Sequence, residues 1–263
     1  MKLFSLLYRF FEFVKHYIVG HNEHGLHSPF VYQLYTTTIQ NHGFPNYEQL
    51  EQHYFELISD HHLITNKNPG AGTSLHKNIR VPIKRLAKHS IKSLPWRQLI
   101  CRLVDERTPQ IVVELGTSFG ITTAYIAATC PNAKIYTFEA NSSLIELSRE
   151  FFKLAGLTNI EIIEGDIDET LPAFLKQHPQ IDVAYIDANH RFEPTINYVE
   201  QLMECVTWKG LIIMDDIYWS YPMTKAWEVL SSKKAVTVSI DLWQIGLLYF
   251  HTGQEKENFK LRF

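Results

Sequence analysis

The sequence predicts an α/β fold in which a doubly wound sheet of seven strands follows a helical N-terminal extension. From about residue 108 onward, short apolar segments alternate with segments of helical periodicity, which is typical of a parallel sheet covered by helices on both faces. The last two apolar segments have no helix between them, and this indicates an antiparallel hairpin at the edge of the sheet. Before residue 108 the pattern is helical and rich in loops.

Each expected strand is a short, mostly apolar run. Five come before the hairpin, and two form it: Gln110–Leu115, Lys134–Glu139, Ile160–Glu164, Ile181–Ile186 and Leu211–Asp215, then Ala235–Ile240 and Gly246–Phe250. A helix is expected at Leu144–Ala155, because Ser143 and Glu146 have the spacing of a capping box. We expect the extension to span residues 1–94 and the α/β domain to span residues 95–263.

The extension begins with Leu3–Ile18, which is rich in Leu, Phe and Tyr. Arg9, Glu12 and Lys15 interrupt it, so no charge-free stretch approaches the roughly 20 apolar residues of a membrane span. No small-residue cleavage site follows, so we expect no signal peptide. We expect an amphipathic helix that packs on the body of the protein or on a second subunit of a homodimer, with binding at a membrane surface as the alternative. Further on, the turn-rich segment Asn66–Thr73 is expected to be a mobile loop.

The composition limits the classes of function. The 263 residues carry a formal net charge of −3, which disfavours a general nucleic-acid binder. The basic stretch from Lys77 to Arg102 is expected to be a solvated helix face rather than a site for RNA or an acidic substrate. Cys101, Cys130 and Cys205 form no CxxC, which indicates neither a disulfide framework nor a zinc site and favours a reducing compartment, the cytoplasm.

The sharpest motif, Glu114–Gly120 (ELGTSFG), lies between the first strand of the domain and the helix that follows it. Gly116 and Gly120 allow a tight turn and a close approach of the backbone to a ligand, and the helix N-terminus offers N–H groups to a carboxylate or phosphate. A second acidic residue, Glu139, ends the next strand, where a carboxylate can accept both ribose hydroxyls of a nucleoside.

Three functions compete for this motif. A dinucleotide enzyme would need a third glycine, and Glu114 would repel its pyrophosphate but attract the ammonium of a methionine moiety. Gly116–Gly120 also matches G-x-S-x-G, the nucleophile elbow of hydrolases, with Asp216 and His251 in the right chain order. That elbow follows several strands, whereas this motif follows the first. The motif therefore favours a nucleoside cofactor that carries a methionine moiety.

Several segments together resemble a known family. ELGTSFGITT, FEAN, GDI, YIDANH and IIMDD resemble class I S-adenosylmethionine-dependent methyltransferases, over about residues 108–250. Within that class they are similar to the metal-dependent O-methyltransferases of the catechol, caffeoyl-CoA and macrocin types. GLHSPFVYQLY (Gly25–Tyr35) resembles a set of bacterial methyltransferase-like proteins. The resemblance implies the Rossmann-like methyltransferase fold and S-adenosylmethionine as the cofactor.

The resemblance also implies a cofactor site. Glu114 and Gly116 would line the methionine end, and Thr122 would bind its carboxylate. Glu139 would hold the ribose, and the dipeptide Asp166-Ile167 would flank the adenine. The complete set of expected cofactor residues is Glu114, Gly116, Thr117, Ser118, Gly120, Thr122, Glu139, Ala140, Gly165, Asp166, Ile167 and Asp187.

Three carboxylates are expected at one edge of the sheet, because Asp187 follows the fourth strand and Asp215 and Asp216 end the fifth. They would repel one another unless a cation lies between them, and a hard divalent ion such as Mg²⁺ would also hold two substrate oxygens. In the O-methyltransferases that the chain resembles, the corresponding acidic positions carry the metal. The alternative is that Asp187 or Asp215 caps a helix or contacts the cofactor.

His190 lies three residues beyond Asp187 and is a candidate to take the proton from a substrate hydroxyl, since the ordinary pKa of histidine is near neutrality. Macrocin-type enzymes have a histidine base at this spacing. The alternative is a loop histidine with a structural hydrogen bond, one of 13 histidines in the chain. We therefore predict methyl transfer from S-adenosylmethionine to a small-molecule hydroxyl, with Asp187 and His190 as catalytic residues. Methylation of a nitrogen or a macromolecule, and a non-catalytic module that binds the nucleoside, are the alternatives.

Overall fold

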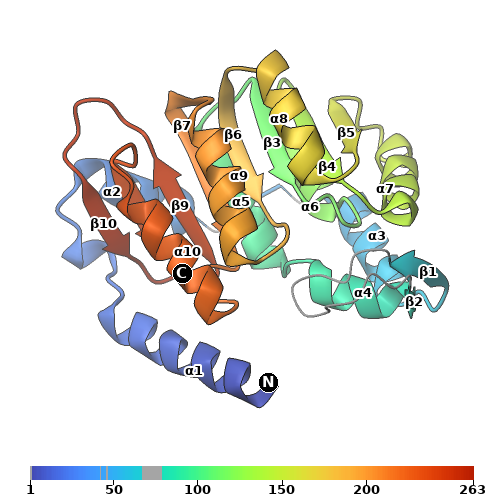
Figure 1. Cartoon of the computed structure of the whole chain (residues 1–263), viewed down its shortest axis with the longest axis horizontal. Coiled ribbons are helices and arrows are strands. Elements are labelled where there is room, and N and C mark those ends of the chain that lie inside the picture. The colour runs from blue at the N-terminus through green and yellow to red at the C-terminus, as the bar shows by residue number, and fades with distance from the viewer. Residues whose placement is uncertain (1, 42, 46, 67–78) are drawn as a thin grey trace. The chain divides into compact units, whose positions relative to one another are not determined.

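The structure is a computed structural model that describes residues 2–41, 43–45, 47–66 and 79–263 (Figure 1). Most of the expected loop Asn66–Thr73 therefore lies outside the described residues. The chain divides into two compact units. We call residues 43–177 the central unit, and residues 1–42 with 178–263 the terminal unit.

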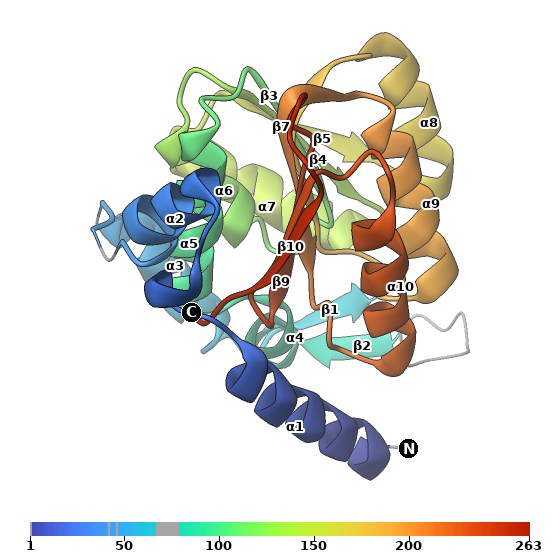
Figure 2. The ribbon, with the colours of Figure 1, turned by 90° about the vertical axis from the view of Figure 1, so that its left-hand side faces the viewer.

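The central unit is built on three parallel strands in the order β3-β4-β5. They are β3 (Ile111–Leu115), β4 (Lys134–Glu139) and β5 (Ile160–Glu164). The helices are α3 (Glu48–Leu57), α4 (Ile83–Ser90), α5 (Leu94–Glu106), α6 (Ile121–Thr129), α7 (Ser142–Leu154) and α8 (Ile167–Gln177). Helix α6 lies on one face of the three strands and α8 on the other (Figure 2). Since both faces are covered, β3 is a nearly continuous apolar run, as is typical of parallel strands.

The terminal unit holds the remaining strands of the sheet, in the order β6-β7-β9-β8-β10. They are β6 (Ile181–Ile186), β7 (Val206–Asp215), β8 (Val238–Asp241), β9 (Ile245–Tyr249) and β10 (Glu257–Lys260). Strands β6 and β7 are parallel, whereas β9 runs antiparallel to both β7 and β8. Helices α9 (Phe192–Met203) and α10 (Tyr221–Ser232) cover one face, and α2 (Pro29–Leu34) lies on the opposite face (Figure 2).

The expected α/β class and the antiparallel edge hairpin are confirmed, but the sheet of the described residues has eight strands rather than seven. The additional strand, β10, pairs in parallel with β8 at the edge. Its four residues include a single apolar side chain, Phe259, so the sequence carried no strand pattern there. The helical extension also contains an antiparallel pair that was not expected, β1 (Leu63–Asn66) and β2 (Ile79–Pro82).

Helix α1 (Lys2–Val19) confirms the helix expected at the start of the extension. It packs on the rest of the terminal unit. Directly after the helix, His21 forms an isolated β-bridge with Leu261 near the end of the chain. Among the described residues, α1 and the other helices are all too short or too polar to cross a membrane.

Candidate active site

The turn between β3 and α6 has the tight geometry that its glycines predicted. Gly116 and Gly120 adopt positive φ values of 105° and 74°, a region that is strained for residues with a side chain. A Cβ atom on Gly120 would lie 2.6 Å from the ring of Phe152, so this position also lacks space. The backbone N–H groups of Gly116 and Thr117 donate to the carbonyl of Phe138, at 3.1 and 3.0 Å, and so fold the turn onto the end of β4.

Glu114 lies inside this turn, and its side chain is buried. Its Oε2 accepts hydrogen bonds from the hydroxyls of Thr123 on α6 and Thr137 on β4, the latter at 2.6 Å. The hydroxyl of Thr117 lies 2.7 Å from that of Thr137 and extends the network. Glu114 therefore ties β3, β4 and α6 together, and its expected contact with the methionine ammonium stays a prediction. Thr122, in the first turn of α6, is half-buried.

Glu139 lies at the end of β4, where the sequence predicted a ribose-binding carboxylate. Its Oε2 accepts the N–H of Ser118 at 2.9 Å, and its Oε1 accepts those of Ala140 and Asn141, both at 2.9 Å. Burial raises the pKa of Glu139, although these three N–H groups oppose the shift by stabilising the carboxylate. A carboxylate has about four lone-pair sites and three are occupied, so Oε2 can accept one hydroxyl group while the side chain holds the turn, and a second hydroxyl would replace an N–H group on Oε1.

The expected adenine-binding residues lie beside Glu139. The carbonyl of Glu139 accepts the N–H of Gly165 at 2.9 Å, and Glu139 is in register with Glu164, the last residue of β5. Asp166 is exposed between β5 and α8, and its Oδ1 accepts the N–H of Asp168 at 3.0 Å. Ile167 begins α8. The structure therefore brings the β3, β4 and β5 ends of the expected cofactor site together within the central unit.

Ser90 is a residue that the sequence analysis missed. It ends α4, and its Oγ accepts a hydrogen bond from the Oγ of Ser118 at 3.0 Å. The extension thus contacts the expected cofactor loop directly. No local pattern marks Ser90, because the contact joins positions 28 residues apart. The same contact disfavours the hydrolase alternative, in which the hydroxyl of Ser118 would donate to a histidine.

A second cluster lies at the ends of β6 and β7 in the terminal unit. The hydroxyl of Tyr185, on β6, lies 3.2 Å from Oδ2 of Asp187 and 2.9 Å from Oδ2 of Asp215, and its single O–H is shared between these two acceptors. Oδ1 of Asp215 accepts the N–H of Asp216 at 2.7 Å, and Asp215 is 1% exposed. The structure thus brings Asp187 and Asp215 together, as their places at parallel strand ends predicted. The sequence analysis did not predict a role for Tyr185, which links the two aspartates, because it lies within an apolar strand and has the pattern of a buried strand residue.

His190 lies beside this pair, and its Nε2 is 3.3 Å from Oδ1 of Asp187. Both side chains are about one-fifth exposed. Burial alone would lower the pKa of His190, but the hydrogen bond and charge of Asp187, with the charges of Asp216 and Asp215, raise it to about 9. The ring of Trp219 lies 6.4 Å from the imidazole, measured between ring centres. The arrangement joins a carboxylate, an imidazole and an aromatic wall at one strand end.

The three aspartates fit a metal site poorly in this arrangement. Both oxygens of Asp215 already accept hydrogen bonds, one from Tyr185 and one from the backbone. In the part of the chain that the structure describes, no three His, Cys, Asp or Glu side chains are grouped so that they could hold a metal ion. The expected Mg²⁺ at Asp187, Asp215 and Asp216 stays a prediction.

Comparison with known proteins agrees with the motifs and the fold. Residues 113–217 match a family described as a methyltransferase domain. A transmembrane O-methyltransferase homolog of Rattus norvegicus is 36% identical over 84 residues, which are 31% of this chain and 33% of the relative. The match thus spans about a third of that relative's length.

Solved structures show the same fold. An SAH-bound methyltransferase of Podospora anserina has a TM-score of 0.61 at 17% identity, and the match covers 86% of this chain and 97% of that one. An O-methyltransferase of Bacillus cereus in complex with SAH has a TM-score of 0.58 at 14% identity, covering 78% of this chain and 91% of that one. Over residues 113–217 the chain is therefore similar to a methyltransferase domain, and it has the fold of these solved methyltransferases.

Proposed function

We propose that this protein transfers a methyl group from S-adenosylmethionine to the hydroxyl of a small molecule. The observation that carries the proposal is the contact of His190 with Asp187 at the carboxyl end of β6, at 3.3 Å. S-adenosylmethionine supplies a methyl group on a positively charged sulfur. What the chain must supply is a place for the cofactor, a place for the acceptor and a group that takes the hydroxyl proton.

The residues at the ends of β3, β4 and β5 fit the cofactor. Glu139 is a carboxylate whose Oε2 retains one acceptor site, which suits a ribose hydroxyl, and the second hydroxyl would replace an N–H group on Oε1. The remaining cofactor residues proposed from the sequence surround the same strand ends and loops, apart from Asp187 at the end of β6 in the terminal unit. They are Glu114, Gly116, Thr117, Ser118, Gly120, Thr122, Ala140, Gly165, Asp166, Ile167 and Asp187.

His190 is the proposed base. Since Nε2 faces Asp187, Nδ1 of the neutral imidazole is the ring atom that would accept the proton of the acceptor hydroxyl as its oxygen bonds to the methyl carbon. Because the pKa of His190 is about 9, the neutral ring gains population as the pH rises, so turnover should rise up to about pH 9. Asp187 orients the ring and stabilises the imidazolium that forms, in the manner of an aspartate that supports a catalytic histidine. The hydroxyl of Tyr185 holds Asp187 from its other oxygen, at 3.2 Å.

The mechanism predicts that His190→Ala lowers turnover by roughly 100- to 10,000-fold while affinity for S-adenosylhomocysteine stays nearly unchanged. Turnover is measured as the formation of S-adenosylhomocysteine with a panel of small hydroxyl compounds. The affinity for S-adenosylhomocysteine is measured by calorimetry. His24→Ala is the control, since this imidazole is 84% exposed and contacts only a neighbouring glutamate in the described contacts. An active His190→Ala protein would remove the histidine from the mechanism. A wild type that binds the product and turns over none of the acceptors would indicate a binding module.

The divalent cation is tested separately. The sequence predicts Mg²⁺ at Asp187, Asp215 and Asp216, although the hydrogen bonds of Asp215 oppose it. If the cation is required, turnover should be lost in EDTA and return with Mg²⁺ or Mn²⁺. Unchanged turnover in EDTA would leave His190 and Asp187 to act alone.

The setting of the reaction is proposed from the composition. The three cysteines are free thiols, which suits the cytoplasm. The net charge of −3 favours a small-molecule acceptor over nucleic acid. We also propose that residues 1–94 act as an acceptor lid or an oligomer contact for the domain formed by residues 95–263.

A further inference from the structure

Helix α1 contacts its own chain mainly through polar side chains, together with the ring of Phe13, whose centre lies 5.2 Å from that of Trp243. The hydroxyl of Tyr8 donates to that of Thr224 at 2.8 Å, and the guanidinium of Arg9 lies 4.7 Å from the ring centre of Trp219. His16 is 4% exposed, and its Nε2 lies 3.1 Å from Oδ1 of Asp241. The face that docks is therefore the polar face, which is the reverse of an ordinary surface helix.

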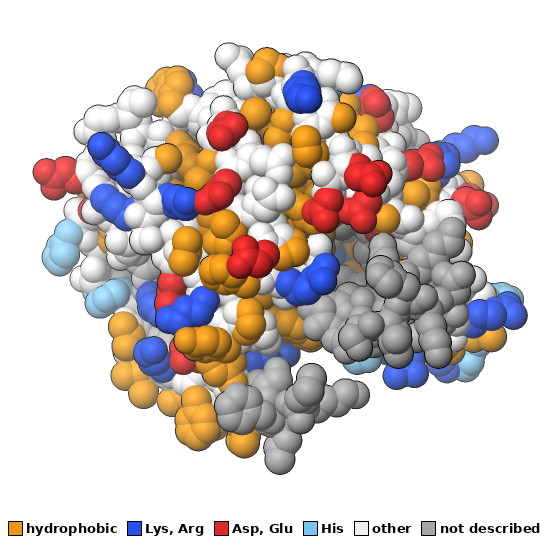
Figure 3. All heavy atoms as spheres, viewed as in Figure 1, with side chains coloured by type: hydrophobic (Ala, Val, Ile, Leu, Met, Phe, Trp, Pro, Cys, Tyr) orange, Lys and Arg blue, Asp and Glu red, His pale blue; other side chains and the backbone are white. Residues whose placement is uncertain are grey.

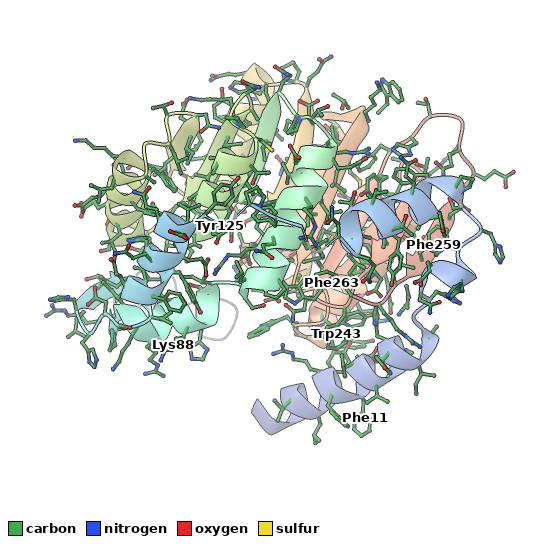
Figure 4. The ribbon with its side chains drawn as sticks, turned by 180° about the vertical axis from the view of Figure 1, so that it is seen from behind. Phe11, Lys88, Tyr125, Trp243, Phe259 and Phe263 are labelled. Atoms are coloured by element: carbon green, nitrogen blue, oxygen red, sulfur yellow. The ribbon has the colours of Figure 1, made fainter. Side chains whose placement is uncertain are left out.

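The opposite face is apolar and uncovered. Phe11 points away from the strands, whereas Trp243 faces the helix from the body (Figure 4). Hydrophobic side chains gather at the lower left of Figure 3, where α1 lies in Figure 1. Seven apolar residues of this face are 38% to 71% exposed, and they are Leu6, Leu7, Phe10, Phe11, Val14, Ile18 and Val19. Phe13 and Tyr17 are also partly exposed, but they contact Trp243 and Arg262 of the body.

This surface is large enough for a stable interface. With about 180 Å² for each large apolar side chain, these seven residues expose on the order of 700 Å². The largest apolar patch of a typical monomer is about 300–600 Å², and a stable dimer typically buries about 800 Å² of each partner. The uncovered face of α1 therefore exceeds what a monomer ordinarily exposes and is close in area to one side of a dimer interface.

The spacing and the charges indicate a helix as the occupant. Leu7, Phe11, Val14 and Ile18 follow one another at intervals of four, three and four, which is the pattern of the a and d positions of paired helices. A helix that binds lipid needs many Lys or Arg side chains on its polar face. On α1 the polar face instead carries two basic residues, Arg9 and Lys15: Arg9 lies over Trp219 of the body, and Lys15 is paired with Glu12 at 3.7 Å.

We propose that α1 pairs with α1 of a second copy of this chain, through a seam formed by Leu7, Phe11, Val14 and Ile18. A twofold axis makes such a contact self-complementary, because the same residues come from both copies. The pairing does not depend on the chemistry proposed above. It assigns to the N-terminal helix the role of holding two copies together.

The test uses the full-length protein in sedimentation velocity and light scattering at micromolar concentration. The wild type should be a dimer. Phe11→Glu and Ile18→Glu, made separately, should each raise the dimer dissociation constant by at least about 30-fold, the effect of a central interface contact. Leu154→Glu is the matched control, because Leu154 on α7 is 71% exposed and apolar but lies outside the seam. It should leave the dimer intact.

Two further measurements keep the outcomes distinct. The thermal midpoint of the wild type should rise with protein concentration, whereas that of Phe11→Glu should not, and the variant should keep the helix content of the wild type. A monomeric wild type, or a dimer that survives both seam substitutions, overturns the proposal. So does a monomer that sediments with liposomes of anionic lipid and loses this binding in the seam variants, which would make lipid the occupant.

Discussion

At the scale of single residues, Glu139 combines two tasks. Its carboxylate holds the N–H groups of Ser118, Ala140 and Asn141, and it is also the proposed ribose ligand. Burial raises the pKa of Glu139 above the ordinary value of a glutamate, so this carboxylate binds a proton more readily in the folded protein than in the unfolded chain. A hydroxyl that donates to Oε2 would favour the charged form further, and a ribose supplies one.

Glu139→Ala is expected to cost about 1.5–3 kcal/mol of affinity for S-adenosylhomocysteine, because it removes a charge-assisted contact to two hydroxyls. Glu139→Gln is the matched variant, since it keeps one acceptor oxygen and loses the charge, and it should fall between Ala and wild type. Calorimetry gives the three dissociation constants. Equal constants for all three proteins would show that the ribose is held elsewhere.

The sequence predicted different roles for Glu114 and Glu139, one at the methionine end of the cofactor and one at the ribose. It did not predict the hydrogen bonds that each carboxylate makes within the protein. In the structure, two threonine hydroxyls, those of Thr123 and Thr137, hold one oxygen of Glu114 in the interior. Those partners come from separate elements, so only the folded chain shows that Glu114 also links β3, β4 and α6.

At the scale of elements, Asp241 at the end of β8 joins three segments. It accepts a hydrogen bond from Tyr218 at 2.7 Å and lies within 3.4 Å of Lys260 on β10 and 3.1 Å of His16 on α1. Burial alone would raise the pKa of Asp241, but the hydrogen bond and charge of His16, the charge of Lys260 and the hydrogen bond of Tyr218 hold it below its ordinary value. The charged form of Asp241 therefore stabilises the fold.

This predicts a stability that depends on acid. Since the pKa of Asp241 is lower in the folded state, its contribution is complete above the unfolded value of about 4 and is lost as the pH falls through the folded value. Asp241→Asn should lower the free energy of unfolding near neutral pH by about 3 kcal/mol and flatten its decline in acid. Urea unfolding at a series of pH values measures both. A variant whose stability declines with acid as steeply as the wild type would contradict this role.

The strands that are buried on both faces, such as β3 and β6, could be predicted because such strands are continuous apolar runs in the sequence. The strand β10 escaped prediction because it is an edge strand with alternating polar residues, and β1 and β2 escaped because they are short and flank a turn-rich segment. Whether an edge segment forms a strand depends on pairing with the neighbouring strand more than on its own composition.

At the scale of the whole molecule, the sequence could not predict which segments form a compact unit. The terminal unit joins residues 1–42 to residues 178–263, although more than 130 residues lie between them. Apolar periodicity predicted an amphipathic helix at the N-terminus, and it predicted packing on the body or on a second subunit. It did not predict that the polar face of the helix would pack on the body. Apolar spacing shows that a helix has an apolar face, but it does not show which surface covers that face.

The docking of α1 has a consequence for the order of events during synthesis. Tyr8 and its partner Thr224 are separated by 216 positions, and His16 and Asp241 by 225. At about 5–20 residues per second, a ribosome makes the partners of α1 roughly 10–40 s after α1 itself. During that interval the helix has nothing to hold its polar face, and its aromatic side chains are available to chaperones or to a neighbouring nascent chain. Two ribosomes on one messenger would therefore present matching helices before either fold is complete.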